Sequence, residues 1–361
     1  MKIVFFELGL KKSIVRTILG NMFNNLIEAI SRQPGYEATF HKDPEEIKSD
    51  TDILVYHTGA EQEKKNSRAL IRFKGPLILY TPPAYNWFNK KFINLWRENI
   101  LFSYSTDASG FSQEKFAKLH IPHLHFPFAS DPETFYPLPA TPKIFDIAFV
   151  GNAQSGTGRY QYIDLLVQKA KKENWKILLL GKDWDKYDIP FQLVAHGSLL
   201  NLIYNSAKIN INIINNEQKL GKNKCLDSNN RLFDLAMSGV FQLANAPQVT
   251  ENYFSQIEVP AFDDPQQWLK QIEYYLNHPE ERQISAEAAR KRALKDHAWN
   301  DRAVNFTDFI EKNIQPWTPP SVSLIKKIRR LCYVYSLEKN YKEGIKHPIK
   351  VAGEIINFLR N

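Results

Sequence analysis

The stretch SNNRLFDLAMSGVFQLA, residues 228–244, carries the pattern on which the fold prediction rests. Ser228, Asn229 and Asn230 are all favourable N-caps, and a short apolar-faced helix is predicted over 231–238. Gly239 stands where helices commonly end in a left-handed residue, and residues 240–244 are typical of a strand. A short helix that is closed by glycine and followed at once by a strand indicates an α/β domain.

Arg231 and Asp234 lie three residues apart and therefore share one face of this predicted helix. A helix N-terminus concentrates partial positive charge, and the guanidinium of Arg231 adds a full charge beside it. That corner suits a diphosphate, and a carboxylate one turn further in can accept hydrogen bonds from ribose hydroxyls. The pattern favours a grip on a nucleotide sugar. The alternative is an exposed arginine and an acid that only complements the helix dipole.

Length and composition describe a globular chain of about two domains. The 361 residues are 43% hydrophobic and 13% aromatic. The opening run 1–6 lacks the apolar core and cleavage site of a signal peptide, and no apolar run approaches the ~20 residues that span a bilayer. Cys225 and Cys332 lie in unrelated contexts, so we expect reduced thiols in a cytoplasmic protein.

The net charge of +8 is concentrated at the end of the chain. Residues 321–361 hold nine Lys and Arg against three Glu, which gives +6 there. A nearly neutral body argues against a nucleic-acid groove, so we expect no nucleic-acid partner. Within 322–335, five apolar residues recur at helical spacing with basic residues opposite: Leu324, Ile325, Ile328, Leu331 and Cys332. This helix either lies on an anionic membrane surface, at the inner face, or packs across the first domain.

The first 126 residues alternate strand-like and helix-like segments, which predicts a doubly wound parallel sheet. The expected strands are 2–6, 36–41, 52–56, 76–81, 100–104 and 123–126, and the expected helices are 13–32, 61–72, 85–98 and 112–120. Ligands of such sheets bind at the carboxyl ends of the strands. His57 follows the third strand and is a candidate general base or acceptor-hydroxyl contact, because imidazole titrates near neutral pH.

Five prolines in residues 127–142 predict an interdomain linker, since so many are incompatible with a helix or an inner strand. Alternation then restarts over 143–314, and the basic extension 315–361 follows. The expected strands are 144–150, 175–180, 191–195, 208–214, 240–244 and 257–262, and the expected helices are 159–173, 199–207, 231–238, 249–255, 265–277, 279–295 and 299–314. Two similar α/β domains joined by a hinge place the natural site in the cleft between them.

Two further turns of the second domain are candidate ligand contacts. The glycine-rich turn 151–158 follows a strand and precedes a helix, and Arg159 at the helix start has a planar fork that can pair with phosphate. The turn matches neither a Walker loop nor the dinucleotide fingerprint, and it is alternatively a plain turn. His196, Gly197 and Ser198 end another strand, where their backbone can frame a nucleobase. Ser198 as an ordinary N-cap explains that turn equally well.

No residue pattern predicts a metal or a cofactor. His123 and His125 share a strand face after His120, but they have no nearby acidic ligand. No Asp-x-Asp element occurs in a setting suited to a cation-bound diphosphate, and the pair at 263–264 precedes a proline as a helix cap does. Helix dipoles and basic side chains would then neutralise the leaving group.

With these residues in hand, the second half resembles the group-1 glycosyltransferases, in particular the branch grouped with spore-maturation-type proteins. The matching pieces are FPFASDP at 126–132 with FYP at 135–137, DIAFVG at 146–151, RLFD at 231–234 with Gly239, YYLNHPEER at 274–282, and HAW at 297–299 with Arg302. The resemblance implies the GT-B architecture, in which two Rossmann-like doubly wound domains face a central cleft. The second domain would hold the donor nucleotide and the first the acceptor, and a late helix would return to the first domain.

The resemblance also implies roles for single residues. Asp234 matches the ribose-binding acid of the family, which is usually Glu, and Arg231 matches the basic residue before it. Glu258 matches the acid in the following strand. Two departures alter the donor grip: Asp is one methylene shorter than Glu, and the first acid of the family's paired-glutamate motif falls on Leu226, beside Asp227.

The sequence therefore predicts a cytoplasmic, metal-independent glycosyltransferase without a cofactor. It would move a sugar from a nucleotide-diphosphate donor to a hydroxyl of a glycan, lipid or protein, with retention as in most related families. Arg159 and Arg231 would stabilise the departing diphosphate. The alternatives are a nucleotide-sugar epimerase of the same fold and a non-catalytic sugar-binding or coat-assembly protein with a degenerate donor site.

Overall fold

The computed structural model describes residues 1–6, 14–41, 47–57, 70–71, 73–81, 90–153, 158–187, 195–214, 219–220, 223–224, 227–315 and 317–337. Within these ranges, side chains are described except at 14–22, 57, 185, 219–220, 223–224 and 335–337. The chain forms two compact units. Unit 1 comprises the described parts of Met1–Ser105 and Ser112–Phe126 and the residues from Ala303 onward, and unit 2 comprises Thr106–Phe111 and Pro127–Arg302.

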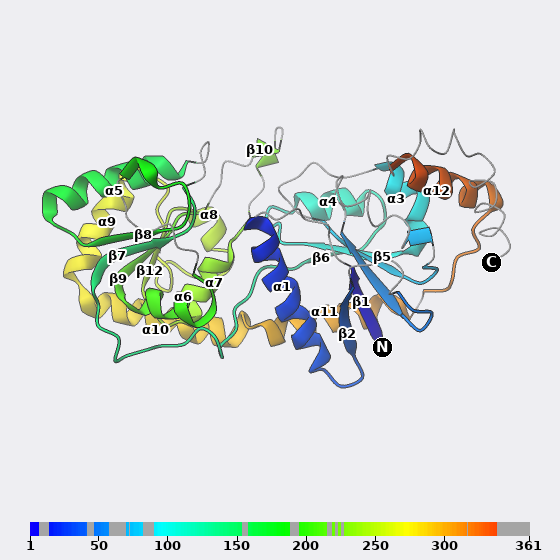
Figure 1. Ribbon diagram of the computed structural model, residues 1–361, viewed down its shortest axis with the longest axis horizontal. Coiled ribbons are helices and arrows are strands. Elements are labelled where there is room, and N and C mark those ends of the chain that lie inside the picture. Colours follow the sequence, from blue (N-terminus) through cyan, green and yellow to red (C-terminus); the bar gives the residue numbers. More distant parts are fainter. Residues whose placement is uncertain are drawn as a thin grey trace. The chain divides into compact units, whose positions relative to one another are not determined.

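Unit 1 is built on a six-stranded sheet in the order β2-β1-β3-β4-β5-β6, in which every neighbouring pair is parallel (Figure 1). Parallel neighbours require crossover connections, so the alternation of strands and helices in the sequence predicted this arrangement. The strands are β1 Lys2–Phe6, β2 Glu37–His41, β3 Ile53–His57, β4 Leu77–Tyr80, β5 Ile100–Ser105 and β6 His123–His125. The helices are α1 Ile14–Ser31, α3 Lys90–Trp96, α4 Phe111–Ala117, the later part of α11 Trp299–Ile314, and α12 Leu324–Leu337, with the 3-10 turn η2 Arg97–Asn99.

One ring of α11 organises the aromatic core of unit 1. Phe306 is fully buried, and its ring lies 5.3–6.2 Å from four other aromatic rings. Those rings belong to Phe5, Phe102, Tyr104 and Phe126. The predicted second domain ended at 314, but residues from Ala303 onward belong to unit 1 because this apolar face of α11 packs there.

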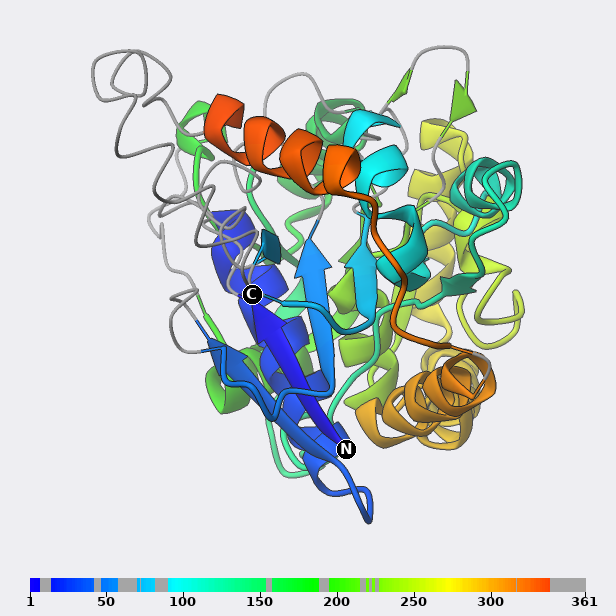
Figure 2. The same cartoon turned by 90° about the vertical axis from the view of Figure 1, so that its right-hand side faces the viewer.

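The C-terminal helix α12 packs against α3 (Figure 2). Tyr333 and Val334 enter the core cluster that also contains Phe92 and Trp96. Packing on the first unit is thus one of the two alternatives that the sequence left open. In the described part of the chain, no helix is both long enough and apolar enough to cross a membrane.

Unit 2 contains a four-stranded parallel sheet in the order β12-β9-β7-β8. Its strands are β7 Phe145–Val150, β8 Ile177–Leu180, β9 Ala207–Asn212 and β12 Gln242–Ala244, and β10 Lys219–Leu220 pairs antiparallel with β11 Asn223–Lys224. Its helices are α5 Arg159–Glu173, α6 Gly197–Asn205, α7 Asn230–Met237, α8 Pro247–Thr250, α9 Pro265–Asn277, α10 Pro279–Asp296 and the start of α11, with the 3-10 turn η3 Asp185–Tyr187.

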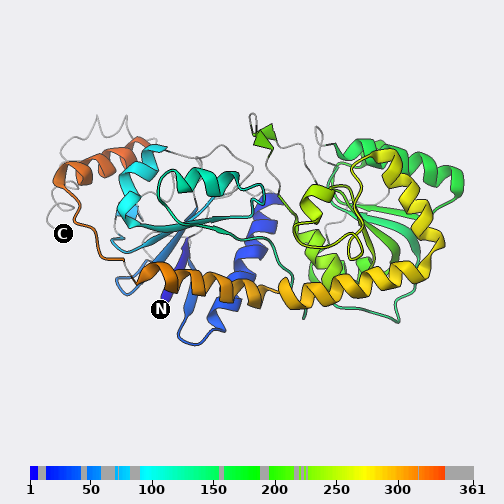
Figure 3. The same ribbon diagram turned by 180° about the vertical axis from the view of Figure 1, so that it is seen from behind.

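Strand β9 shows why helices cover both faces of this sheet. Ile209 and Ile211 join a buried apolar cluster with residues of α5 and α9. The alternate residues Asn210 and Asn212 point to the other face, where Asn210 Nδ2 donates to the Tyr204 carbonyl of α6 at 3.0 Å. Figure 3 shows α9 and α10 (yellow) beside the strands of this sheet. The doubly wound α/β class predicted from the sequence is confirmed for both units.

The expected strand at 257–262 is wrong. Residues 256–258 form a turn and residue 259 a bend, and only Ala261 makes a bridge, to Ala244. The Glu258 carboxylate accepts hydrogen bonds from the backbone N–H of Ser255 at 2.7 Å and from its hydroxyl at 3.1 Å, which closes the turn. Such side-chain bonds to nearby backbone compete with a strand ladder, and the β-branched residues alone could not reveal them. Most of the expected helix 61–72 and strand 191–195 lies outside the described residues.

Candidate functional site

The N-terminus of α7 is shaped by two asparagines. Asn229 is the N-cap, and its side-chain oxygen accepts from the Leu232 N–H at 3.0 Å. Its Nδ2 donates to Asn212 Oδ1 at 3.0 Å, and Arg231 Nη1 donates to the same oxygen at 3.3 Å. The end of β9 therefore fixes both the cap and the first-turn arginine of the helix.

Arg231 extends from α7 across the end of β7. Its guanidinium lies 4.5 Å from the ring centroid of Phe149, in cation–π geometry. Burial lowers the pKa of Arg231, while the charges of Tyr204 and Asp234 and a hydrogen bond to Tyr204 oppose that shift. The guanidinium remains charged at neutral pH because arginine titrates far above it. The site thus contains a fixed positive charge in a largely buried setting.

Arg159 approaches the same ring from the start of α5. Its guanidinium carbon lies 5.9 Å from the Phe149 centroid, and Nη1 donates to the Asn152 carbonyl at 2.8 Å. Burial, and then the charge of Arg231, lower the pKa of Arg159 to about 10. Arg159 Nε is buried and has no hydrogen-bond partner in the described structure. The two arginines singled out from the sequence are thus brought together, and neither forms an ion pair with a described Asp or Glu.

Gly151, between β7 and α5, leaves room for this arrangement. A Cβ atom at this position would lie 2.5 Å from Arg231 Nη2 and 3.1 Å from Phe149 Cζ. The absence of a side chain at residue 151 is what lets the guanidinium approach the backbone at the end of β7. At the other end of α7, Gly239 has φ +64°, as its predicted place after the helix requires.

Asp234 lies one turn into α7 and is hydrogen-bonded within the protein. Its Oδ1 accepts from the Ser130 hydroxyl at 2.8 Å. Burial raises the pKa of Asp234 to about 7, although the Ser130 hydrogen bond and the charge of Arg231 act in the opposite direction. Ser130 is itself held by its backbone, which bonds to His297 and Trp299 at 3.0 and 3.2 Å. Near neutral pH this carboxyl therefore exchanges a proton.

The raised pKa predicts a specific pH dependence of stability. Because the unfolded acid ionises near 3.8 and the folded one near 7, the folded state binds more protons between these values. Stability from this group is therefore lost as the pH rises from about 4 to about 7. We expect Asp234→Asn, which keeps an acceptor for Ser130, to lose less thermal stability than the wild type over this interval.

Melting temperatures of both proteins between pH 4.5 and 8 check this expectation. The comparison cancels the titration of other groups that both proteins share. Asp183→Asn, at an exposed position of unit 2, is the matched control. If the melting temperatures of wild type and Asp234→Asn change with pH in parallel, the Asp234 carboxyl does not titrate in this range.

The remaining predicted residues are found at the start of α6, in a turn and at the end of β3. His196 is the exposed N-cap residue of α6 without a side-chain capping bond, Gly197 begins the helix with φ +54°, and Ser198 is in the first turn, so Ser198 is not the N-cap. Glu258 is in the Ser255 turn described above, so its placement in a strand was wrong. His57 ends β3 in unit 1, where its backbone pairs with Tyr80, and its side chain is outside the described set.

Several residues of the site were not predicted. Phe149, Asn212, Tyr204 and Ser130 contact Arg231 or Asp234 in the structure. One signal for Asn212 was available, because the run ININ at 209–212 alternates asparagine with isoleucine in a strand that is otherwise apolar. The Ser130 contact had no local signal, since 104 residues separate it from Asp234.

A second acid with a raised pKa lies just before α7. Asp227 forms an antiparallel bridge with Asp107, which places a residue of the 106–111 segment beside it in unit 2. Burial raises the pKa of Asp227 to about 7, and the charge of Asp107 adds to this shift. Among the described residues, no group of three or more His, Cys, Asp and Glu is arranged to hold a metal ion.

Known proteins resemble this chain in two ways, by a family model that matches part of its sequence and by solved structures with a similar fold. Residues 159–308 match the family model described as glycosyl transferase-like. That stretch includes Arg159, Arg231, Asp234 and Glu258. A comparison with curated protein sequences finds no match.

Solved structures of glycosyltransferases share the fold over most of the chain. A glycosyltransferase from Rickettsia africae is 11% identical with a TM-score of 0.61, covering 87% of this chain and 99% of its own. HepE of Anabaena, solved with UDP and glucose, is 9% identical with a TM-score of 0.60, covering 86% and 99%. An α-glucosyltransferase solved with UDP-glucose and DNA is 11% identical with a TM-score of 0.59, covering 86% and 99%. The fold is therefore GT-B, as the resemblance implied.

Proposed function

We propose that this protein is a glycosyltransferase that binds a nucleotide-diphosphate sugar at the N-terminus of α7. The observation that carries the proposal is the pair of half-buried arginines, Arg159 and Arg231, on one phenylalanine ring beside a helix start. Two adjacent cations that form no ion pair with a described carboxylate are a site for a strongly anionic group. The family match over the same stretch and the UDP-bound structures of the same fold support a diphosphate as that group.

In the proposed reaction the sugar leaves the diphosphate and joins a hydroxyl of a glycan, lipid or protein. Negative charge develops on the leaving diphosphate, and two preorganised guanidinium groups stabilise it without reorganisation. This role for arginine supports metal independence. Retention of configuration and the spore-maturation-type branch rest on the resemblance to group-1 glycosyltransferases, and His57 remains the candidate contact for the acceptor hydroxyl. The DNA-bound neighbour gives no support for excluding a nucleic-acid acceptor.

Asp234 is proposed to hold the ribose. Its Oδ1 already accepts from Ser130, so a ribose hydroxyl would have to share or replace that bond. The same observation favours the alternative of a non-catalytic sugar-binding or coat-assembly protein, because a carboxyl satisfied within the protein is a weaker ligand contact.

Ligand-induced stabilisation separates these functions. UDP-glucose and UDP should raise the melting temperature of the wild type, while glucose or inorganic phosphate alone should not. Only the two nucleotides carry both a diphosphate for the arginines and a ribose for Asp234. Release of UDP that depends on an acceptor extract then distinguishes a transferase from a binding protein and from an epimerase. If UDP- and GDP-linked sugars and the free nucleotides all leave the melting temperature unchanged, the proposal is wrong.

A substitution next to the arginines tests the geometry. We expect Gly151→Ala to weaken UDP-glucose binding at least about tenfold, because the added Cβ would displace the Arg231 guanidinium, and small displacements in a site of this kind have large effects. Apparent affinities from thermal shift or calorimetry provide the measurement. Gly110→Ala, also in unit 2, adds a Cβ in open space but at φ +77°, so it should lower the melting temperature through backbone strain and leave the affinity for UDP-glucose unchanged. It therefore controls for a general loss of stability. Equal affinity of Gly151→Ala and wild type would remove Arg231 from the donor site.

A further inference from the structure

The described contacts that fix helix α12 to unit 1 come from one of its faces. Arg330 Nε donates to the Leu95 carbonyl at 2.7 Å, and its Nη2 donates to Asn99 Oδ1 at 2.9 Å. One turn earlier, Lys326 forms an ion pair with Glu98. Leu331 and Val334 are buried beside these anchors. These contacts determine the rotation of the helix about its axis and hence which residues face outward.

The outward face begins with three exposed apolar side chains. Leu324, Ile325 and Ile328 have exposed fractions of 57%, 65% and 37%. The sequence pattern had grouped them with Leu331 as one apolar face, but the structure buries Leu331 and leaves these three in contact with solvent. Exposed aliphatic residues that are neighbours at helical spacing form a local apolar patch, which differs from isolated exposed residues.

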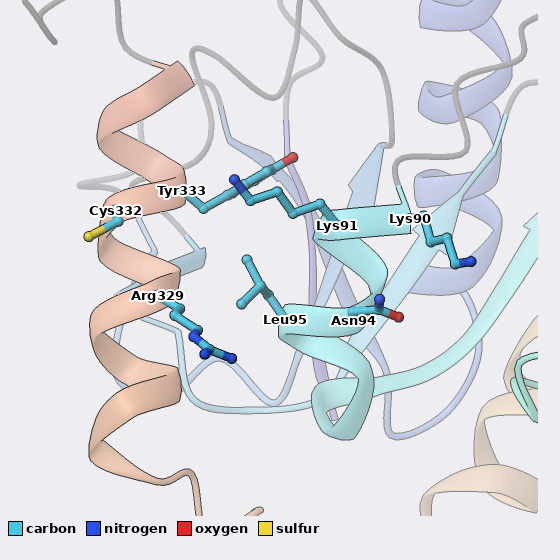
Figure 4. A pocket seen from close by; sticks show the side chains of 7 residues that line it. All are labelled: Lys90, Lys91, Asn94, Leu95, Arg329, Cys332 and Tyr333. Atoms are coloured by element: carbon cyan, nitrogen blue, oxygen red, sulfur yellow. The ribbon is translucent and has the colours of Figure 1, made fainter.

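A basic cavity lies next to this apolar patch, between α3 and α12. Its volume is about 580 Å³, and it is lined by Lys90, Lys91, Asn94, Leu95, Arg329, Cys332 and Tyr333. Figure 4 shows Lys91 alongside Tyr333 and Leu95 in the gap between the helices. Lys91 Nζ lies 5.6 Å from the Tyr333 ring centroid. No Asp or Glu is among the described residues that line the cavity. Its lining therefore combines three cationic side chains with the apolar surfaces of Leu95 and Tyr333.

We propose that the outward face of α12 and this cavity form a docking surface for an anionic lipid bilayer. Leu324, Ile325 and Ile328 would enter the interfacial region, and Lys90, Lys91 and Arg329 would contact lipid phosphate groups. Apolar side chains bordered by lysine and arginine are the combination that such surfaces attract. A free phosphate would use the cations but leave the apolar patch in water, and the patch therefore favours the bilayer. This surface is in unit 1 and does not depend on the proposed donor site.

Vesicle flotation of the full-length protein without nucleotide tests the proposal. We expect binding to vesicles that contain about 30% phosphatidylglycerol and at least tenfold less binding to pure phosphatidylcholine. Ile325→Ser with Ile328→Ser should reduce the bound fraction about tenfold, and Lys90→Glu with Arg329→Glu should do the same. Ile257→Ser with Ile284→Ser is the matched control, since these residues are 71% and 61% exposed in unit 2. This control should bind like the wild type.

Several results would overturn the proposal. The protein could float equally with both kinds of vesicle, or the Ile325/Ile328 variant could bind as well as the wild type. The control could also lose as much binding as the test variants. If inorganic phosphate raises the melting temperature of the protein as much as anionic vesicles do, the cavity binds a soluble anion instead. Leu324→Ser alone repeats the apolar test with a minimal change, and an unchanged melting temperature of each variant ties any loss to the surface.

Discussion

With Arg231 replaced by methionine, the rate of UDP release from UDP-glucose is expected to fall about 100- to 1000-fold, the loss seen when one preorganised donor to a developing charge is removed. Arg231 lies at the N-terminus of α7, stacked on Phe149 and bonded to Asn212. Methionine keeps much of the side-chain volume and the apolar contact with the ring. The loss would therefore report the missing charge and its hydrogen bonds.

The measurement is UDP release in the presence of a heat-treated acceptor extract, together with the thermal shift produced by UDP-glucose. Arg231→Lys should recover only part of the activity, because an ammonium group lacks the planar fork of arginine. Arg292→Met is the matched control, since Arg292 is exposed on α10 and pairs with Asp296. Full activity of Arg231→Met would contradict the assignment of Arg231 to the leaving diphosphate.

Replacing Phe306 by alanine is expected to lower the free energy of unfolding of unit 1 by about 3–5 kcal/mol, the usual loss for a fully buried phenylalanine. The ring contacts four other aromatic rings, from β1, from β5 and from Phe126, which follows β6. Removing it leaves a cavity where these rings meet, and rigid rings close such a cavity poorly.

Urea unfolding followed by aromatic fluorescence and circular dichroism gives the free energy. Val304→Ala, at a 41%-exposed position of the same helix, is the control and should change stability by less than about 0.5 kcal/mol. A Phe306→Ala protein as stable as this control would show that the aromatic cluster does not hold α11 to unit 1.

Local sequence signals identified some helices better than others. The expected helices 199–207 and 249–255 are displaced by two residues or more from α6 Gly197–Asn205 and α8 Pro247–Thr250. The bounds of α9 and α11 were predicted as they occur, because a proline after Asp264 starts the first of them and a strong apolar period runs through the second. The prediction of a strand at 257–262 was wrong for a physical reason. Glu258 closes a turn with Ser255 through its carboxylate, and strand propensity carries no information about such a bond.

The site was predictable only in part for a similar reason. Arg159 and Arg231 each follow a strand and start a helix, so their meeting at the sheet edge follows from the topology. The partner of Asp234 depends on how the segment around Ser130 returns past α7, and that path is set by contacts with His297 and Trp299. Contacts between residues so far apart produce no periodic pattern in the sequence, so they cannot be predicted from one sequence alone.

The dependence of unit 1 on α11 and α12 has a consequence for how the chain is made. A ribosome releases β1–β6 early, yet Phe306, Tyr333 and Val334, which complete their hydrophobic core, are translated only after the whole of unit 2. Unit 2, whose residues end at Arg302, is available to fold first. Nascent chains usually mature from the N-terminus. Here the sheet of unit 1 must wait for α11 and α12, so its apolar strands are available to chaperones while unit 2 is being synthesised.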